Sequence, residues 1–417
     1  MNNNGKSFST RRRQLLAVAG GAAVTMSPLA VAALAGEQAA RLRVGIVLPQ
    51  SNRFPDLSLR TLEGFQSFAA TPAGRVLQLV PIAVDRGPVA ALDAATRAVE
   101  GARVDVLAGI VDRNRARRLA PVLEANGVPF VVSDMGADIV RNHRESAFLV
   151  RNSLGYWQSC FAMGEWSAGN LGTRALIAAD FLESGHDMVY AFRHGFERAG
   201  GEILDVKVTG IPDGTAGFAK AGDAIRSQRP DFVFAFYSGK RADAFLHYYE
   251  SEGLSHIAQL AGPALLTDAA SSTGILPSAR AGIVTASTWA PDLDAPLARE
   301  FQATHRSIHG GDPGVFAMLG YETAQRIATS FEAAGRDRSR LPAALHGTAF
   351  EAPRGEVAAL DGMAEHSSPV YVRRLTHTAN GLENLTIAAL PPIDLQGSRG
   401  ELRAMTKTGW AHAYLAA

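Results

Sequence analysis

Short apolar runs alternate with longer amphipathic segments along the chain from residue 42 onwards. In the first part, apolar runs lie at residues 42–49, 77–84, 104–110 and 130–133, and segments with apolar residues at helical spacing lie at residues 56–68, 89–100 and 113–126. Strands that alternate with helices of this length predict βαβ units and a parallel sheet. Because the apolar runs are continuous, we expect strands that are buried on both faces, as in an open doubly wound sheet.

The same alternation restarts after an apolar run at residues 148–152. Predicted helices at residues 157–168, 188–199, 218–227 and 242–252 are interleaved with predicted strands or extended segments at residues 173–179, 202–208, 231–237, 257–261 and 282–287. The pattern therefore predicts an α/β fold with a second lobe of similar architecture, although no close sequence repeat relates the two lobes.

The last part of the chain combines two long helices with a group of strands. The helices are predicted at residues 292–309 and 315–334, and the strands at residues 355–360, 369–376 and 385–389. Asn380 and Gly381 form a strong hairpin signal before the last strand. The periodicity is lost from residue 391, so we expect residues 392–417 to form a loosely packed tail.

The first 36 residues indicate a segment that directs export. Arginines at residues 11–13 precede an uncharged run at residues 17–35, which ends in an A-x-A site at Ala35. This combination predicts a signal peptide (residues 1–35) that is cleaved after Ala35. A membrane anchor is the alternative, but glycines and Pro28 interrupt a run that would need about 20 apolar residues to span a bilayer. The pair at residues 12–13 resembles a twin-arginine leader.

Composition narrows the class of partner and the kind of fold. The formal net charge of +1 gives no reason to expect nucleic acid or an anionic membrane surface as a partner. Hydrophobic residues make up 47% and charged residues 19% of the chain, which fits a globular protein with a core. Cys160 is the single cysteine and cannot form an internal disulfide, and its apolar helical context is typical of a core residue.

The usual motifs of catalysis and cofactor binding are missing from the sequence. We find no G-x-S-x-G, H-E-x-x-H, Walker A or G-x-G-x-x-G pattern. His305 and His309 have a helical spacing that could bind a metal ion, but no carboxylate or thiol partner is apparent, which favours a surface helix. We therefore predict no catalytic residue, no metal site and no cofactor.

Several local motifs occur in an order and spacing that resemble one protein family. They are residues 44–49 with residues 63–65, residues 105–109, residues 120–123, residues 127–133, residues 229–233, residues 320–324, and residues 350–357 with Asp361. Each motif is weak alone. Together, over residues 41–390, they make the chain similar to type I periplasmic solute-binding proteins of ABC importers, in the branch that includes the proteins for branched-chain amino acids.

The resemblance implies two doubly wound, Rossmann-like lobes that close on a small molecule by a hinge motion. The N-terminal lobe would comprise residues 41–152 and about 288–350, and the C-terminal lobe residues 153–287 and about 351–391. The resemblance also implies a monomer in the periplasm, with an ABC permease and ATPase as its membrane partners.

The ligand should lie beyond the carboxyl ends of the strands, where open α/β sheets bind their ligands. The expected ligand-binding residues in these loops are Ser51, Asn52, Phe54, Asp112, Arg113, Asn114, Ser133, Met135, Phe181, Ser184, Tyr237, Ala264 and Trp289. The alternatives to ligand contact are a solvated turn at residues 50–54, an Arg113 that pairs with Asp112 or faces water, and a core-edge position for Tyr237.

Two positions bear on the class of ligand. Arg113 or Asn114 stands where the amino-acid-binding members of the family place a serine, and the guanidinium of Arg113 could hold a carboxylate with two hydrogen bonds. Those members also tend to carry an acid near residue 264 for the ligand's ammonium group, which Ala264 cannot supply.

We therefore expect the substrate-binding component of an ABC transporter, with an aromatic or apolar acid or a neutral compound as its ligand instead of a free α-amino acid. A periplasmic sensor that signals to a membrane partner is one alternative, and an enzyme on the same scaffold is another.

Overall fold

A computed structural model describes residues 41–84, 88–101, 103–111, 113–140, 146–210, 217–268, 281–347, 349–359, 366–379, 381–394, 399–407 and 414–415. Leu42–Ala417 form one compact unit, distinct from Met1–Arg41. The predicted signal peptide, with its cleavage site at Ala35 and its twin arginines, lies outside the described residues.

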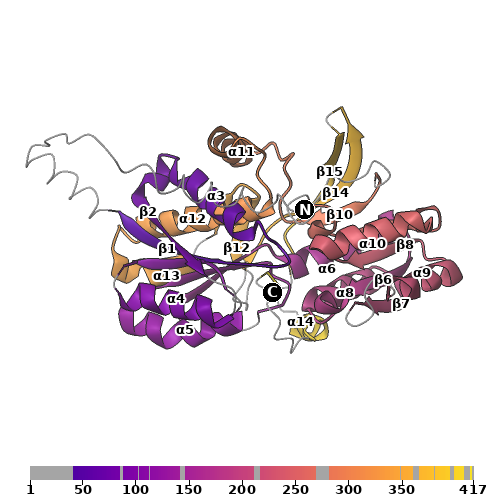
Figure 1. The fold of residues 1–417 in the computed structure, drawn as a ribbon, viewed down its shortest axis with the longest axis horizontal. Helices are drawn as coiled ribbons and strands as arrows, with labels where there is room; N and C mark the ends of the chain where they lie inside the picture. The colour runs from indigo at the N-terminus through magenta and orange to yellow at the C-terminus, as the bar shows by residue number, and fades with distance from the viewer. Residues whose placement is uncertain are drawn as a thin grey trace, which may run out of the picture. The chain divides into compact units, whose positions relative to one another are not determined.

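The first sheet is parallel throughout and has helices on both faces (Figure 1). Its strands, in the order β2-β1-β3-β4-β5, are β1 (Leu42–Pro49), β2 (Leu77–Val84), β3 (Val106–Ile110), β4 (Phe130–Asp134) and β5 (Leu149–Ser153). Val44 and Ile46 belong to the core shared with α3 (Leu57–Ala69) and α12 (Val315–Ala333). Val47 points the other way, towards α4 (Pro88–Glu100) and α5 (Arg113–Asn126). Both faces of the first sheet are therefore buried, as its continuous apolar runs predict.

The second sheet is mixed, because a hairpin extends its parallel part. Its order is β15-β14-β10-β9-β8-β6-β7, with strands β6 (Arg174–Asp180), β7 (Glu202–Thr209), β8 (Phe232–Phe236), β9 (Gln259–Pro263), β10 (Val284–Ser287), β14 (Val370–Thr378) and β15 (Gly381–Leu390). The pairs β10/β14 and β14/β15 are antiparallel. One face is covered by α6 (Tyr156–Asn170) and α8 (Asp187–Arg198), and the other by α9 (Gly217–Gln228) and α10 (Gly239–Ser251).

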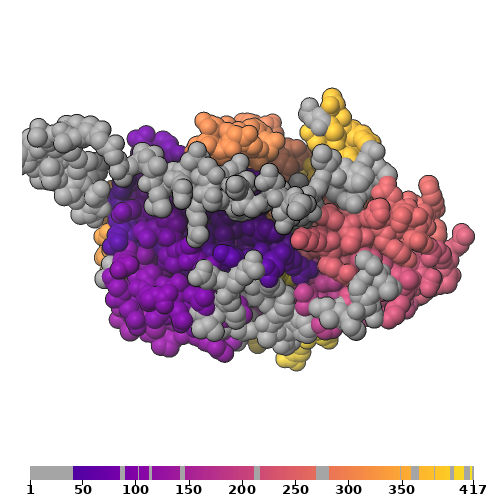
Figure 2. All heavy atoms as spheres, viewed as in Figure 1, coloured from indigo at the N-terminus to yellow at the C-terminus, as the bar shows by residue number. Residues whose placement is uncertain are grey.

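Each sheet with its helices forms one lobe. On the face that Figure 2 shows, the first lobe is mainly indigo and purple and the second mainly magenta and red, so on this face each lobe comes largely from one stretch of chain. The remaining elements are α7 (Phe181–Ser184), α11 (Pro296–His309), α13 (Leu341–His346), α14 (Arg399–Met405), a small sheet of β11 (Phe350–Ala352), β12 (Gly355–Ala359) and β13 (His366–Ser367), and 3₁₀ turns at Ala73–Val76, Leu254–His256, Ala264–Leu266 and Arg338–Arg340.

A buried arginine joins the segments that connect the two lobes. Arg354 donates from Nη2 to the Ser153 carbonyl (2.9 Å) and from Nη1 to the Thr288 hydroxyl (3.1 Å). It also forms two hydrogen bonds of 2.6 Å with Glu322 on α12, and both side chains are buried. Ser153 ends β5, Thr288 follows β10 and Arg354 follows β11, so this ion pair ties three connections to one helix.

Two predictions about local packing are wrong. The tail is not loosely packed at α14, because this helix packs on α8 with Met405 fully buried. His305 is not on a helix surface: it is 1% exposed, and its Nδ1 lies 3.1 Å from the Ser67 hydroxyl. Gly381 begins β15 as the hairpin signal suggests, whereas Asn380 lies outside the described residues.

Candidate functional site

Loops from the carboxyl ends of strands meet where the two lobes touch. The first lobe contributes the segments after β1 and β4, and the second lobe contributes those after β6 and β8. Side chains from these segments form ion pairs between the lobes, and His186 also contacts the ring of Tyr414 from the tail. This is the edge at which open α/β sheets bind ligands.

An ion pair joins Arg53, in the loop after β1, to Glu183 of α7 in the other lobe. The buried Glu183 carboxylate also accepts a hydrogen bond from the Ser238 hydroxyl (2.6 Å). A second carboxylate, Asp180, lies 3.9 Å from the Arg53 guanidinium and is paired with Arg241 (Nε to Oδ1, 3.0 Å). The charges at this edge are therefore arranged in opposite pairs.

The environment of this ion pair leaves two polar atoms available. Burial raises the pKa of Glu183 above its usual value, although Arg53 opposes this shift. Burial disfavours the charge on Arg53, but the neighbouring carboxylates, Glu183 foremost, outweigh it and raise the pKa of Arg53. Arg53 Nη1 and Glu183 Oε2 are buried and have no hydrogen-bond partner among the described residues. The pair therefore retains one donor and one acceptor for a ligand.

Aromatic groups from both lobes and from the tail surround the same point. The Tyr414 ring is stacked with Phe54 (centroids 6.3 Å apart) and packs edge-on to Tyr156 (6.1 Å) and His186 (5.3 Å). The guanidinium carbon of Arg53 lies 5.3 Å from the centre of the Tyr414 ring, within the range of a cation–π contact. We call the group that surrounds Tyr414 the aromatic site: Arg53, Phe54, Tyr156, Glu183 and His186.

Tyr156 is held by backbone groups of two predicted ligand loops. Its N–H donates to the Met135 carbonyl (3.0 Å), and its phenol oxygen accepts the N–H of Leu265 (2.6 Å). Gly136 has φ +68°, and a Cβ there would lie 2.8 Å from the backbone nitrogen of Gly155. Glycine is therefore required at residue 136 for the loop to approach the start of α6.

A second contact between the lobes lies beside His186. The Asp138 carboxylate is 3.0 Å from His186 Nδ1 and accepts the Asp187 N–H (3.0 Å). In return, the Asp187 carboxylate accepts the N–H of Ile139 (3.0 Å). Burial opposes ionisation of Asp138, but the hydrogen bond and charge of His186 outweigh it and lower the pKa of Asp138. The aromatic site thus lies between two polar contacts that join the lobes.

The predicted residues of the first loop have different environments. Phe54 is fully buried and faces Tyr414. Ser51 accepts the N–H of Phe54 (3.1 Å), so it shapes the loop, whereas Asn52 is exposed. The alternative of a solvated turn therefore describes Asn52 but not Phe54.

The residues predicted after β3 and β4 contribute less directly. Asp112 lies outside the described residues, and Arg113 and Asn114 begin α5 with side chains that are also outside them, so their ligand contacts stay predictions. Ser133 is buried against α12, with its Oγ 2.9 Å from the Thr323 hydroxyl. The Met135 side chain is part of the core.

In the second lobe, the two aromatic residues predicted to contact a ligand have different environments. Phe181 is 40% exposed, and Ser184 donates to its carbonyl (2.8 Å). The Tyr237 ring lies 4.1 Å from that of Phe245, and its hydroxyl is 2.8 Å from the Thr209 hydroxyl. Tyr237 is thus a core residue, the alternative that the sequence left open.

The last two predicted residues flank the aromatic site. Ala264 is fully buried, immediately before the Leu265 N–H that holds Tyr156. Trp289 is 2% exposed and lines a groove of about 530 Å³ together with Asp56 and Arg373. Its indole nitrogen has no hydrogen-bond partner in the described part of the chain. Trp289 therefore lines a hollow of its own, and its ring packs against that of Phe301 (centroids 6.0 Å apart).

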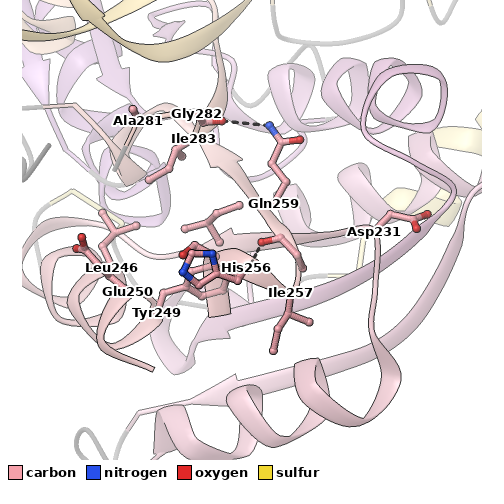
Figure 3. A pocket seen from close by; sticks show the side chains of 13 residues that line it. Asp231, Leu246, Tyr249, Glu250, His256, Ile257, Gln259, Ala281, Gly282 and Ile283 are labelled. Carbon is pink, nitrogen blue, oxygen red and sulfur yellow. Dashed lines mark hydrogen bonds between the residues drawn. The ribbon is translucent and has the colours of Figure 1, made fainter. Parts of the chain in front are cut away.

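A separate hollow of about 280 Å³ lies within the second lobe (Figure 3). Asp231 precedes β8 and Gln259 begins β9, so this hollow is at the amino ends of the strands, opposite the aromatic site. Gln259 donates to the Gly282 carbonyl (3.1 Å), and Tyr249 donates to the Ala258 carbonyl (2.8 Å). Its position and these internal hydrogen bonds argue against a solute site.

Five residues of this site are not among the ligand-binding residues predicted from the sequence: Arg53, Tyr156, Glu183, His186 and Tyr414. A usable signal existed for the ion pair, because Arg53 and Glu183 carry opposite charges in loops that follow the first strand of each lobe. A signal also existed for Tyr414, because it follows Trp410 and precedes Leu415 in an aromatic and apolar stretch that is unusual for a loose tail.

Across the described ranges, no three His, Cys, Asp or Glu side chains are grouped closely enough to hold a metal ion. In the same ranges, no helix has the length and apolar character needed to span a membrane.

Comparisons with known proteins place the chain in a family. A sequence model described as a periplasmic binding protein matches residues 41–380, which shows that the chain belongs to the periplasmic binding protein family. The Leu/Ile/Val-binding protein homolog 6 of Brucella abortus is 26% identical over 374 residues, which cover 86% of this chain and 94% of that protein.

Solved structures share the fold. The solute-binding protein of an ABC transporter from R. palustris, solved in complex with benzoate, is 26% identical with a TM-score of 0.70 and covers 85% of this chain and 98% of its own. A solute-binding protein from Rhodopseudomonas palustris HaA2, in complex with p-hydroxybenzoic acid, is 23% identical with a TM-score of 0.72 and covers 86% and 100%. The predicted two-lobed α/β fold and the predicted family are therefore confirmed.

Proposed function

We propose that this chain is the periplasmic substrate-binding component of an ABC importer and that it captures an aromatic acid between its lobes. The observation that carries the proposal is the aromatic site, in which a phenol ring fits between Phe54 and Tyr156 beside the Arg53 guanidinium. Aromatic rings bring a large apolar area and a preferred stacking geometry to such a site.

The polar groups of the site suit a carboxylate on the ring. Arg53 Nη1 is a buried donor without a partner among the described residues, and a carboxylate would accept a charge-assisted hydrogen bond from it. Glu183 Oε2 is likewise buried without a partner among the described residues, and it could accept a hydrogen bond from a hydroxyl group on the ring. Arg113 is an additional proposed contact for the carboxylate.

A free amino acid is the alternative class of ligand to an aromatic acid. Because residue 264 is alanine, the sequence predicts no acidic side chain there for the ammonium group of an amino-acid ligand. Glu183, however, brings a carboxylate into the site from another loop. That carboxylate is already bonded to Arg53 and Ser238, so an amino acid would have to separate an existing ion pair. We favour an aromatic acid because its carboxylate needs only the available donor of Arg53.

The related proteins support this choice of ligand class. Two solute-binding proteins of the same fold hold benzoate and p-hydroxybenzoic acid, whereas the name of the Brucella relative refers to branched-chain amino acids. We further propose export with cleavage near Ala35, a monomeric state, and delivery to an ABC permease and ATPase. A periplasmic sensor is the alternative, because exposed lobe tips would contact a membrane partner in either case, and turnover of a bound compound would contradict the binding role.

Thermal-shift measurements with four compounds test this proposal. Benzoate and 4-hydroxybenzoate should raise Tm, because a ligand at 100 times its Kd stabilises the folded state by about 2.7 kcal/mol. Benzamide, which keeps the ring but lacks the charge, should raise Tm less. A rise with leucine and none with either aromatic acid would contradict the proposed ligand class.

A further inference from the structure

The ring in the aromatic site comes from the chain's own C-terminal tail. Tyr414 is 7% exposed and Leu415 is 3% exposed, so both residues are buried, and the Tyr414 ring contacts Phe54 of the first lobe and His186 of the second. The preceding helix, α14, packs on α8 of the second lobe (Figure 1). The tail therefore reaches the site from outside the loops that form it.

The ring of Tyr414 suits the site better than its hydroxyl does. The ring has aromatic neighbours and a guanidinium beside it. The hydroxyl lies beside Ser238, but it has the geometry of a hydrogen bond with none of the described residues. Arg53 Nη1 and Glu183 Oε2 are also buried without a hydrogen-bond partner among these residues. A buried polar atom without a hydrogen bond weakens the state that contains it. A well-packed ring with an unpartnered hydroxyl is expected of a side chain that an external ligand can replace.

We propose that Tyr414 is an internal ligand that occupies the aromatic site and that an external aromatic acid must displace. This inference rests on the proposed function, because both concern the same site. An aromatic acid would bring a carboxylate acceptor to Arg53, which a phenol ring without a carboxylate cannot do. The site would therefore select an aromatic ring that carries an acid over the tail's own ring.

Internal occupancy has a calculable effect on affinity. The apparent affinity of a ligand equals its affinity for an empty site multiplied by the fraction of molecules whose site is empty. If the tail occupies about nine sites in ten, an external ligand binds about tenfold more weakly than to an empty site. The tail has the further advantage of a tether, which keeps its effective concentration high.

The base of the tail is attached to the contact between the lobes. The N–H of Lys407 donates to one oxygen of the Asp187 carboxylate (2.7 Å). The other oxygen accepts the N–H of Ile139 in the first lobe (3.0 Å). The position of the tail is therefore coupled to the contact that holds the lobes together.

Removal of the internal ligand is the first part of the test. One variant lacks residues 408–417 and keeps α14, and a second carries Tyr414→Ala. Calorimetric titration with 4-hydroxybenzoate should give a Kd about tenfold lower for both variants than for the unchanged chain. Tyr190→Ala, which alters an exposed tyrosine on α8, should leave the Kd unchanged. Equal Kd values for the unchanged chain and the two tail variants would overturn the proposal.

A peptide separates this inference from the choice of external ligand. A synthetic peptide of residues 408–417 should bind the shortened chain, and the same peptide with Tyr414→Ala should not. This result does not depend on any aromatic acid, so failure of 4-hydroxybenzoate to bind would count against the proposed function alone. No binding of the tyrosine peptide at millimolar concentration would overturn the internal-ligand proposal.

Tyr414→Phe distinguishes an internal ligand from a structural support. The change removes the unpartnered hydroxyl and keeps the ring, so the tail should hold the site more tightly and the Kd for 4-hydroxybenzoate should rise several-fold. A purely structural role predicts instead that Tyr414→Ala lowers Tm while the Kd stays constant, and that outcome would overturn the proposal.

Discussion

At the scale of single residues, Arg53 connects the two lobes and offers a contact to the ligand. Its guanidinium bonds to Glu183 across the site and still presents Nη1 as a buried donor. The sequence placed Arg53 in a ligand loop, but a charged residue in a loop is usually solvated, and nothing in the local pattern indicates a partner 130 residues away. Long-range pairing of this kind depends on how the lobes meet.

Arg53→Met should weaken binding of an aromatic acid. Loss of a hydrogen bond to a charged group costs about 1.5–3 kcal/mol, whereas binding of benzamide should change little because it carries no charge. Calorimetric titration to saturation measures the Kd for benzoate and for benzamide. Arg193→Met, on the exposed face of α8, is the matched control. An equal loss for benzoate and benzamide would show that Arg53 acts through packing alone.

His305 should make the fold sensitive to mild acid. Burial, assisted by the nearby His309, lowers the pKa of His305 to about 4. The unfolded chain then binds a proton that the folded chain does not, so the free energy of unfolding should decrease as the pH falls from about 6.5 to about 4.

His305→Asn tests this sensitivity through Tm at pH 7 and at pH 4.5. The drop in Tm between the two values should be smaller in the variant than in the unchanged chain. The exposed His256→Asn serves as the control and should keep the full drop. If His305→Asn also keeps the full drop, His305 does not cause the acid sensitivity.

At the scale of elements, the hydrophobic pattern predicts the strands and helices that have long periodic runs. The strand Leu77–Val84 and the helix Arg113–Asn126 have the predicted bounds. The four-residue helix Phe181–Ser184 was missed because it is too short to show a period, yet it carries Glu183. The helix Arg399–Met405 was missed for the same reason, and it carries the tail towards the aromatic site.

The ion pair between Arg354 and Glu322, at the connections between the lobes, joins two motifs that are each weak alone. Glu322 belongs to the motif at residues 320–324 and Arg354 to the motif at residues 350–357. The sequence gives no reason to join them, whereas the structure makes them a buried ion pair at the connections between the lobes.

Arg354→Met should be strongly destabilising. Removal of one partner from a buried ion pair leaves the other charge uncompensated and typically costs about 3–5 kcal/mol. Urea denaturation measures the change in the free energy of unfolding. Arg336→Met, which breaks the exposed pair with Glu332, should give no resolvable change. A comparable, small effect for both variants would mean that the hinge pair does not stabilise the fold.

At the scale of the whole molecule, two polar contacts hold the lobes together around the aromatic site. One is the pair Arg53–Glu183 and the other is Asp138 with His186. Binding proteins of two lobes work by opening and closing about a hinge. We therefore expect the contacts between the lobes to set how readily this molecule opens.

The double variant Arg53→Met with Asp138→Ala should open more often. Small-angle X-ray scattering without ligand should report a larger radius of gyration than for the unchanged chain, with the free lobes separated by hinge motion. Arg226→Met, which breaks a surface pair within one lobe, should leave the radius unchanged. An unchanged radius in the double variant would show that the polar contacts do not control closure.

The most direct measurement is a calorimetric titration of the chain with 4-hydroxybenzoate, alongside the variants Phe54→Ala and Phe181→Ala. Phe54 lines the aromatic site and Phe181 is exposed. We predict one bound molecule per chain, a loss of about tenfold or more in affinity for Phe54→Ala through lost aromatic contact and buried area, and no loss for Phe181→Ala. The absence of binding at millimolar ligand, or binding that Phe54→Ala leaves unchanged, would contradict capture of an aromatic acid at this site.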